Sequence, residues 1–289
     1  MDYTLVLTAT LGALDDQSVK IASRMTAVPP HWLSPGTACE FRLSTSLSIA
    51  DVRAAIGPAA VDANLIPSER RRKRLLVADM DSTIIGCECV DEIAAFAGLK
   101  TKIAAITERA MRGEIAFESS LRERIALLKG TPEAVLERVY KERVRLNDGA
   151  RALVRTMSEH GALTVLVSGG FTFFTGRVAQ AAGFATHQSN ELVIANGVLA
   201  GTVREPILGH DAKRDALRRL TQDNLIDLQD TLAIGDGAND LAMIDEAGLG
   251  VAYRAKPVVA AAADAQLDHS DLTAALYLQG YRETELVLD

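Results

Sequence analysis

Short apolar runs that end abruptly in polar residues constrain the fold of this 289-residue chain more than any other feature. The runs cover residues 75–78, 163–167 and 231–234, with 248–252 as a fourth candidate. A strand that is buried on both faces of a parallel sheet has this continuous apolar pattern. Helical patterns at residues 150–160, 172–182, 213–221 and 241–247 alternate with the runs. The alternation predicts right-handed crossovers and an α/β fold with a doubly wound parallel sheet.

Two inserts interrupt this alternation. Residues 90–140 have an almost entirely helical pattern, with stops at Gly98, Gly113 and Gly130. A group of helices between the first and second strands would lie above the sheet as a cap, which we expect at about residues 87–145. Residues 191–202 contain Asn196-Gly197 between two apolar runs, a strong signal for a β-hairpin.

The first 68 residues predict a separate, small α+β domain. Strand patterns at residues 3–8 and 39–43 alternate with helical patterns at 15–25 and 48–56, the latter with Ser48 as N-cap. The charged run ERRRKR at residues 69–74 follows. A nucleic-acid or targeting patch is one interpretation of this run, but a solvated linker into the second domain, residues 69–289, is favoured.

Composition excludes several classes of protein. The formal net charge of −7 argues against general nucleic-acid binding, which requires a basic face. The three cysteines are too few for a disulfide framework, and the spacing of Cys87 and Cys89 does not match a zinc site. The N-terminus lacks the pattern of a signal peptide, and no apolar run is long enough to span a membrane. We therefore expect a cytoplasmic protein with no membrane or nucleic-acid partner.

Polar residues follow each core run, where ligands bind in open α/β sheets. The segments are Asp79-Met80-Asp81-Ser82-Thr83, Ser168-Gly169-Gly170 and Gly235-Asp236-Gly237-Ala238-Asn239-Asp240. Asp79, Asp81 and Asp236 would converge at one edge of the sheet, and several carboxylates need a cation to share a site. Hard oxygen ligands predict Mg²⁺. A carboxylate beside Mg²⁺ could attack phosphorus, and a second one two residues later could serve as general acid and base.

Further residues could hold a phosphate group. Ser168 supplies a hydroxyl, and Gly169 and Gly170 supply backbone N–H groups near an expected helix start. Lys213 lies at the start of another helix and could neutralise phosphoryl oxygens and Asp79. Each segment alone also fits an ordinary turn, loop, N-cap or surface lysine. Their joint occurrence at the ends of core elements favours catalysis.

With these motifs the chain resembles the phosphatases of the haloacid dehalogenase (HAD) superfamily, and within it the phosphoserine phosphatases. The resemblance covers residue 75 to the C-terminal region and includes the helical cap. It implies Asp79 as nucleophile, Asp81 as general acid and base, and Mg²⁺ as cofactor. Asp79, Asp236 and the Asp81 backbone carbonyl would bind the metal, with Asp240 in support. Residues implied to hold phosphate or line the site are Ser168, Gly169, Lys213 and Asn239.

The resemblance also implies a substrate. Glu88 matches the acidic residue that meets the substrate ammonium group, and Arg124 matches the arginine that binds its carboxylate. Met111 and Phe117 match apolar positions that cover the substrate. We therefore expect hydrolysis of O-phospho-L-serine, the last step of serine biosynthesis. Gly86 and Cys87 depart from the polar residues usual in the family, so the entrance to the site is expected to differ.

Alternatives remain open at this stage. The chain could be a HAD phosphatase or phosphotransferase for another small phosphomonoester, or a regulatory protein that accepts phosphate or senses an amino acid. The N-terminal domain is similar to ACT-like regulatory domains but lacks one expected strand in the sequence pattern. A homodimer also stays open.

Overall fold

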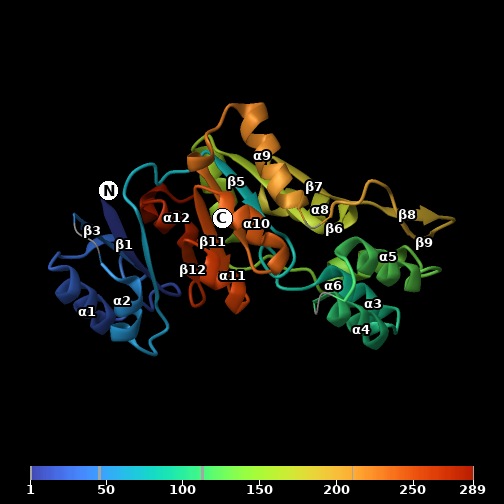
Figure 1. Cartoon of the computed structure of the whole chain (residues 1–289), viewed down its shortest axis with the longest axis horizontal. Coiled ribbons are helices and arrows are strands. Elements are labelled where there is room, and N and C mark those ends of the chain that lie inside the picture. Colours follow the sequence, from blue (N-terminus) through green and yellow to red (C-terminus); the bar gives the residue numbers. More distant parts are fainter. Residues whose placement is uncertain (1, 45–46, 112–113, 210, 289) are drawn as a thin grey trace.

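The computed structural model describes residues 2–44, 47–111, 114–209 and 211–288. Along its long axis it consists of an N-terminal module, a central α/β core and a helical cap at the opposite end from the module (Figure 1). Among the described residues, no helix is long and apolar enough to cross a membrane.

The N-terminal module is a four-stranded antiparallel sheet with two helices. Its elements are β1 (Tyr3–Thr8), α1 (Asp16–Thr26), β2 (His31–Ser34), β3 (Ala38–Leu43), α2 (Ile49–Ile56) and β4 (Asp62–Pro67). The sheet order is β2-β3-β1-β4, which with the βαββαβ chain order gives a ferredoxin-like split βαβ arrangement. The predicted N-cap Ser48 is confirmed, since its side chain accepts a hydrogen bond from the Asp51 backbone N–H. Asp15, which the sequence placed inside the first helix, is instead the N-cap of α1 and accepts from the Ser18 backbone N–H. β2 and β4 were not predicted.

The core is a six-stranded parallel sheet. Its strands are β5 (Leu75–Ala78), β6 (Leu163–Phe171), β7 (Thr186–Asn190), β10 (Thr231–Gly235), β11 (Leu249–Tyr253) and β12 (Ala265–Leu267), in the order β12-β11-β10-β5-β6-β7. All five pairs are parallel. The four runs singled out in the sequence are the central strands, whereas the edge strands β7 and β12 were not predicted. The doubly wound α/β prediction is confirmed.

Helices cover both faces of this sheet. On one face lie α7 (Ala150–Glu159), α8 (Thr172–Ala182) and α12 (Ala274–Leu278); on the other lie α9 (Ala212–Asn224), α10 (Leu241–Glu246) and α11 (Pro257–Ala262). Short 3₁₀ turns are η1 (Leu228–Asp230), η2 (Ala238–Asp240) and η3 (Glu283–Glu285). In β5, Leu76 and Ala78 belong to the apolar cluster on the first of these faces, and Leu75 and Val77 belong to the cluster on the second. Alternating side chains therefore bury both faces of the strand.

The two inserts form as predicted. The cap consists of α3 (Cys89–Phe96), α4 (Lys100–Met111), α5 (Phe117–Leu127) and α6 (Ala134–Glu142). The hairpin consists of β8 (Leu192–Ala195) and β9 (Val198–Val203), and its turn residues Asn196 and Gly197 have φ of 52° and 74°. Positive φ at both positions is typical of the tight turn that the Asn-Gly pair favours.

The segment between module and core is held more firmly than expected of a solvated linker. Arg70 pairs with Asp227 and Asp230. Arg71 donates to the buried Glu40 carboxylate at 2.7 Å and also to two backbone carbonyls of α12. Lys73 is buried, and its Nζ donates to two backbone carbonyls. This charged run therefore makes intramolecular contacts with the core, and Arg71 also joins β3 of the module to α12.

The N-terminal module also binds the edge of the core sheet directly. Asp62 of β4 accepts hydrogen bonds from the backbone N–H groups of Asp268, His269 and Ser270. Asn64 exchanges two bonds with the Gln266 backbone, donating to its carbonyl at 2.9 Å and accepting from its N–H at 2.8 Å. The Asp62 and Asn64 side chains thus form hydrogen bonds with backbone groups in β12 and just after it.

Candidate active site

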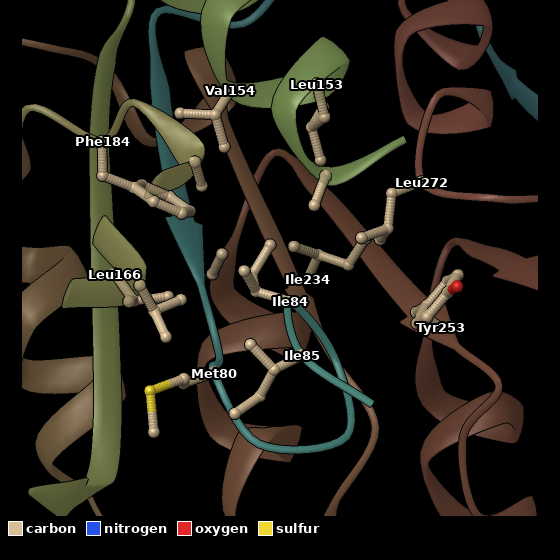
Figure 2. Packing of buried hydrophobic residues seen from close by; sticks show 14 of the residues in the cluster. Met80, Ile84, Ile85, Leu153, Val154, Leu166, Phe184, Ile234, Tyr253 and Leu272 are labelled. Carbon is tan, nitrogen blue, oxygen red and sulfur yellow. The ribbon is translucent and has the colours of Figure 1, made fainter. Parts of the chain in front are cut away.

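The loop after β5 is anchored in the core by three apolar residues. Met80, Ile84 and Ile85 are fully buried, and Figure 2 shows them packed with side chains from β6, β10 and α7. Asp79 and Asp81 flank Met80, so alternation directs their carboxylates away from this apolar cluster. The Asp79 backbone N–H donates to the Ile234 carbonyl at 3.0 Å, which extends the pairing with β10 beyond β5. Core packing therefore fixes the position of both carboxylates.

A buried lysine links the ends of two strands. The Lys213 Nζ lies 2.6 Å from Asp79 Oδ1 and also contacts Asp240 Oδ1. Burial opposes the charge on the lysine, but Asp240 and Asp79 more than offset this and raise its pKa. The other oxygen of Asp240 accepts from the backbone N–H groups of Asp236 and Gly237. At Gly235 a Cβ would lie 2.4 Å from Asp240 Cγ, so only glycine allows this close approach.

Three carboxylates gather beside this lysine. Asp79, Asp236 and Asp240 each offer an oxygen within 4.8 Å of the others. Burial and Asp240 raise the pKa of Asp79 well above its usual range, against the effect of Lys213. Burial, Asp240 and Glu88 raise the pKa of Asp236 to about 6, although Thr83 Oγ1 donates to it at 3.2 Å. An oxygen-rich cluster whose charged form is costly fits a hard divalent cation.

Asp81 is in a different environment. Its Oδ1 is buried and has no hydrogen-bond partner among the described residues. Burial and the charge of Glu88 raise its pKa to about 7, while the nearby Cys89 thiol and backbone N–H act in the opposite direction. A carboxyl group with a pKa near neutrality can both give and take a proton at working pH.

Asp79, Asp81 and Asp236 line a cavity of about 610 Å³ between core and cap. The core wall includes Asp79, Asp81, Ser168, Gly169, Gly170, Asp236 and Asn239; the cap side includes Glu88, Val90, Asp91, Phe117, Ser120 and Arg124. Lys213 lines a small adjoining pocket with Ser168, Gly169, Asn239 and Phe117. One cavity therefore presents carboxylates on its core side and an arginine on its cap side.

Gly169 and Gly170 lie within the last residues of β6, whereas the sequence placed them at the start of a helix. β6 continues through both of them to Phe171, and α8 begins at Thr172. The Gly170 N–H donates to Ser168 Oγ at 2.9 Å. At Gly169 an added Cβ would lie 3.0 Å from the Phe117 ring, so the cap ring rests against bare backbone. The extended strand brings Ser168 and Gly169 to the cavity, and Phe117 covers them from the cap.

Comparisons with known proteins agree with this geometry. A family model described as haloacid dehalogenase-like hydrolase matches residues 76–245. The chain belongs to the haloacid dehalogenase-like hydrolase family.

Relatives within this family include curated phosphoserine phosphatases. One from Streptomyces coelicolor is 42% identical over 260 residues, which cover 87% of this chain and 62% of the relative. The matched region spans 58%, 62% and 65% of the length of three such relatives, this one included.

Solved structures extend the likeness to the whole chain. A HAD family hydrolase from Salmonella enterica serovar Typhi has a TM-score of 0.86 at 31% identity, covering 96% of this chain and 98% of that one. A structure described as a phospho-aspartyl intermediate analogue of phosphoserine phosphatase has a TM-score of 0.66 at 36% identity, covering 71% of this chain and 98% of that one.

In this HAD-like hydrolase, the predicted site residues come together with one exception. Met111 ends α4, but its side chain lies outside the described residues. Glu88 accepts a hydrogen bond from Ser82 Oγ at 2.7 Å, and Ser82 has a φ of 60° that turns the loop. Arg124 Nε donates to the Ser120 carbonyl at 3.3 Å, and burial lowers the pKa of the arginine. Glu88 and Arg124 both line the cavity.

Sequence reasoning missed several residues of the site, among them Thr83, Asp91, Ser120 and Lys256. Thr83 bonds Asp236, and Asp91, Ser120 and Lys256 line the cavity. Thr83 lies in a segment that the sequence had singled out, so its hydroxyl could have been included. Ser120 lies one helical turn before Arg124, and its buried Oγ has no partner among the described residues. Asp91 and Lys256 resemble ordinary surface charges in the sequence.

Proposed function

We propose that the protein hydrolyses O-phospho-L-serine to L-serine and phosphate through a phosphorylated Asp79, the reaction that completes serine biosynthesis. The observation that carries the proposal is the single cavity, with Asp79 and Asp81 on its core wall and Glu88 and Arg124 on its cap wall. The curated relatives named phosphoserine phosphatase support it.

The chemistry divides into two steps. Asp79 attacks phosphorus, and Asp81 gives its proton to the serine oxygen as the P–O bond breaks. In the second step Asp81 takes a proton from water, which attacks the phosphoaspartate and releases phosphate and the free Asp79 carboxylate. Lys213 and Ser168 hold phosphoryl oxygens in both steps. The pKa of about 7 at Asp81 suits a group that changes role between them.

A divalent cation belongs to this proposal. The Asp79 and Asp236 carboxylates and the Asp81 backbone carbonyl would hold Mg²⁺. Asp240, whose oxygens already bind Lys213 and two backbone N–H groups, would support this set from behind. When bound, Mg²⁺ supplies positive charge that offsets the repulsion between carboxylate and phosphoester. The clustered oxygens and the raised pKa of Asp79 support a cation here.

The cap provides the basis for substrate choice. Arg124 would bind the serine carboxylate through its two-pronged guanidinium, and Glu88 would meet the ammonium group. Phe117 would cover the phosphate end against bulk water, which matters because the phosphoaspartate must react with one water only.

Phosphate release from L-phosphoserine with Mg²⁺ tests the proposal, beside a panel of other small phosphomonoesters. We expect a strong preference for phosphoserine that is lost with EDTA and in Asp79→Asn. Activity spread across the panel would keep the Asp79 chemistry but assign the protein to another phosphomonoester. No turnover with stable phosphate on Asp79 would favour a phospho-accepting regulator.

Arg124→Ala tests recognition of the carboxylate. We expect kcat/KM for phosphoserine to fall by about 30- to 1,000-fold, because a charged hydrogen-bonding partner is lost, whereas turnover of an aryl phosphate changes little. Arg122→Ala is the matched control, since Arg122 lies on the same helix and pairs with the exposed Glu205. Equal losses on both substrates would contradict the role of Arg124.

A further inference from the structure

Asn190 is a buried polar residue that the mechanism proposed above does not use. It ends β7 and is 3% exposed, whereas the residues before it in that strand are exposed or half-buried. Burying an amide is unfavourable unless its donor and its acceptor are both paired. Here Nδ2 donates to the Gly169 carbonyl at 2.9 Å, and Oδ1 accepts from the Leu208 N–H at 2.7 Å. Because one partner accepts and the other donates, the amide has a single favourable orientation.

The bond to Gly169 lies where the pairing of two strands is interrupted. β6 and β7 pair regularly up to Val167, and pairing resumes at Phe171, opposite Asn190. Residues 168–170 of β6 lie between these pairs, against one residue of β7. Extra residues in one strand disrupt the backbone hydrogen bonds and redirect side chains. The Asn190 side chain therefore holds a stretch of β6 that the regular pairing leaves out.

This bond acts on Ser168 through one peptide unit. A trans peptide is planar, and its C=O and N–H point in opposite directions. While Asn190 holds the Gly169 carbonyl, the N–H of the same peptide, which belongs to Gly170, points away from Asn190. It donates to Ser168 Oγ at 2.9 Å. Because the Ser168 oxygen already accepts this bond, its own hydrogen is directed elsewhere and can be donated.

The Ser168 hydroxyl lies beside groups that the proposed function assigns to the reaction. A Cβ added at Gly170 would lie 3.1 Å from Ser168 Oγ and 3.4 Å from Asp81 Oδ2, so both side chains approach the same point of the backbone. Ser168 also lines the small pocket that contains Lys213. The direction of this hydroxyl therefore matters for the phosphoryl oxygens.

We propose that Asn190 is a positioning residue: it fixes the peptide between Gly169 and Gly170, and this peptide orients the Ser168 hydroxyl toward the phosphoryl group. The inference rests on the proposed function, in which Ser168 holds phosphoryl oxygens. Without the amide donor the peptide can rotate, and the hydroxyl loses its fixed direction. A donor must be in place before charge moves in the transition state, so the loss falls on kcat.

A double-mutant cycle with Ser168 separates positioning from a purely structural role. Asn190→Asp keeps an acceptor for the Leu208 N–H and loses the donor to the Gly169 carbonyl. We expect it to lower kcat for phosphoserine by about 10- to 100-fold and to change KM by less than about threefold. In a Ser168→Ala background the same change should lower kcat by less than about threefold, because the group that Asn190 positions is gone. Equal losses in both backgrounds would overturn the positioning role.

Ser189→Ala is the matched control. Ser189 precedes Asn190 in β7, and its Oγ bonds Thr175 Oγ1 of α8 at 2.8 Å. The variant removes one hydrogen bond of the same strand without affecting Gly169, so kcat should stay at the wild-type value. A fall in kcat as large as that in Asn190→Asp would mean that weakening β7 is sufficient, and would overturn the inference.

An aryl phosphate separates the inference from the choice of substrate. The cycle should give the same coupling on p-nitrophenyl phosphate as on phosphoserine, because both present a phosphoryl group to Ser168. Absence of phosphoserine turnover in the wild type, with this coupling on the aryl ester, would overturn the proposed function and support the role of Asn190.

Nuclear magnetic resonance of the wild type gives a readout that does not depend on how the variants fold. Inorganic phosphate with Mg²⁺ should shift the side-chain NH₂ resonance of Asn190. The NH₂ resonance of Asn64, which donates to the Gln266 carbonyl at the module, should stay in place. An unchanged Asn190 resonance at saturating phosphate would overturn the inference even if no Asn190 variant folded.

Discussion

Charge balance among a few buried residues sets the properties of the site. Asp79 and Asp240 contact one lysine, and Asp236 belongs to the same carboxylate cluster. Asp81 Oδ1 has no hydrogen-bond partner in the part of the chain that the structure describes. Burial penalises negative charge, so without a cation Asp79, Asp81 and Asp236 retain their protons to higher pH than usual, because their pKa values are raised. The residues that serve catalysis in the proposal are therefore expected to weaken the fold at neutral pH until a cation binds.

Thermal stability of the metal-free protein tests this expectation. The pKa of Asp81 is raised to about 7 and that of Asp236 to about 6, both above the unfolded value of 3.8. Between the unfolded and the folded pKa values the folded state holds more protons than the unfolded state. The stability that these two protonated carboxyl groups contribute is therefore lost as pH rises from about 4 to 7. Mg²⁺ should raise the Tm by about 5–10 °C at pH 7 under near-saturating conditions and by less at pH 5.

The difference in Tm with and without Mg²⁺ at each pH cancels the contributions of titratable groups far from the site. Buffer with EDTA and no added metal provides the metal-free reference. A metal-induced rise in Tm that is the same at pH 5 and pH 7 would contradict the assignment of the raised pKa values to the cation site.

Helices and strands differ in how well the sequence predicts them. The central strands and most helices could be predicted because their apolar patterns are set by burial on the sheet. β7 has the polar sequence Thr-His-Gln-Ser-Asn at the sheet edge, and β12 has only three residues, so neither carries a clear strand pattern. β4 contains Asp62 and Asn64, which are unfavourable in strands in general but here bond the core. The polar motifs identified the floor of the site, whereas Ser120 and Lys256 enter it only through tertiary packing.

The segment that returns from the cap to the core offers a test at the scale of elements. Gly149 is the N-cap of α7 and has a φ of 78°, and a Cβ there would lie 2.4 Å from the Thr273 backbone nitrogen. Gly149→Ala should therefore lower the free energy of unfolding by about 2–4 kcal/mol, through backbone strain plus a steric clash.

Gly161→Ala is the matched control, because Gly161 has a φ of 83° but nothing within 4 Å of the added carbon. It should cost only the strain, about 1–2 kcal/mol. Urea unfolding of both variants measures the difference, and equal losses would mean that the Thr273 contact relaxes without cost.

At the scale of the whole molecule, the N-terminal module is attached to the core by polar groups as well as by apolar packing. One face of its sheet contributes Val6, Leu33, Ala38 and Ile66 to the same cluster as α12. Asp62 adds bonds to three backbone N–H groups of the loop after β12. This loop in turn contacts the cap return, since the Leu272 N–H donates to the Asp148 carbonyl at 3.1 Å.

Asp62→Ala tests how firmly the module is held. The change leaves three backbone donors without their acceptor and should weaken docking by about 2–4 kcal/mol. Hydrogen–deuterium exchange should rise at residues 268–273, and proteolysis should become faster at 68–74. Glu69→Ala, an exposed acidic residue in that connector, is the control. Unchanged exchange in Asp62→Ala would mean that the apolar contacts alone hold the module.

The exchange of bonds between Asn64 and Gln266 has a consequence for handling the protein. β12 is the last strand on its side of the core sheet, and an unpaired strand edge is a template for association with other chains. Asn64 occupies part of that edge with a side chain rather than a strand. A core freed of residues 1–67 would expose the edge together with the apolar face of α12. Such a fragment would therefore be prone to self-association during refolding, even with every catalytic group in place.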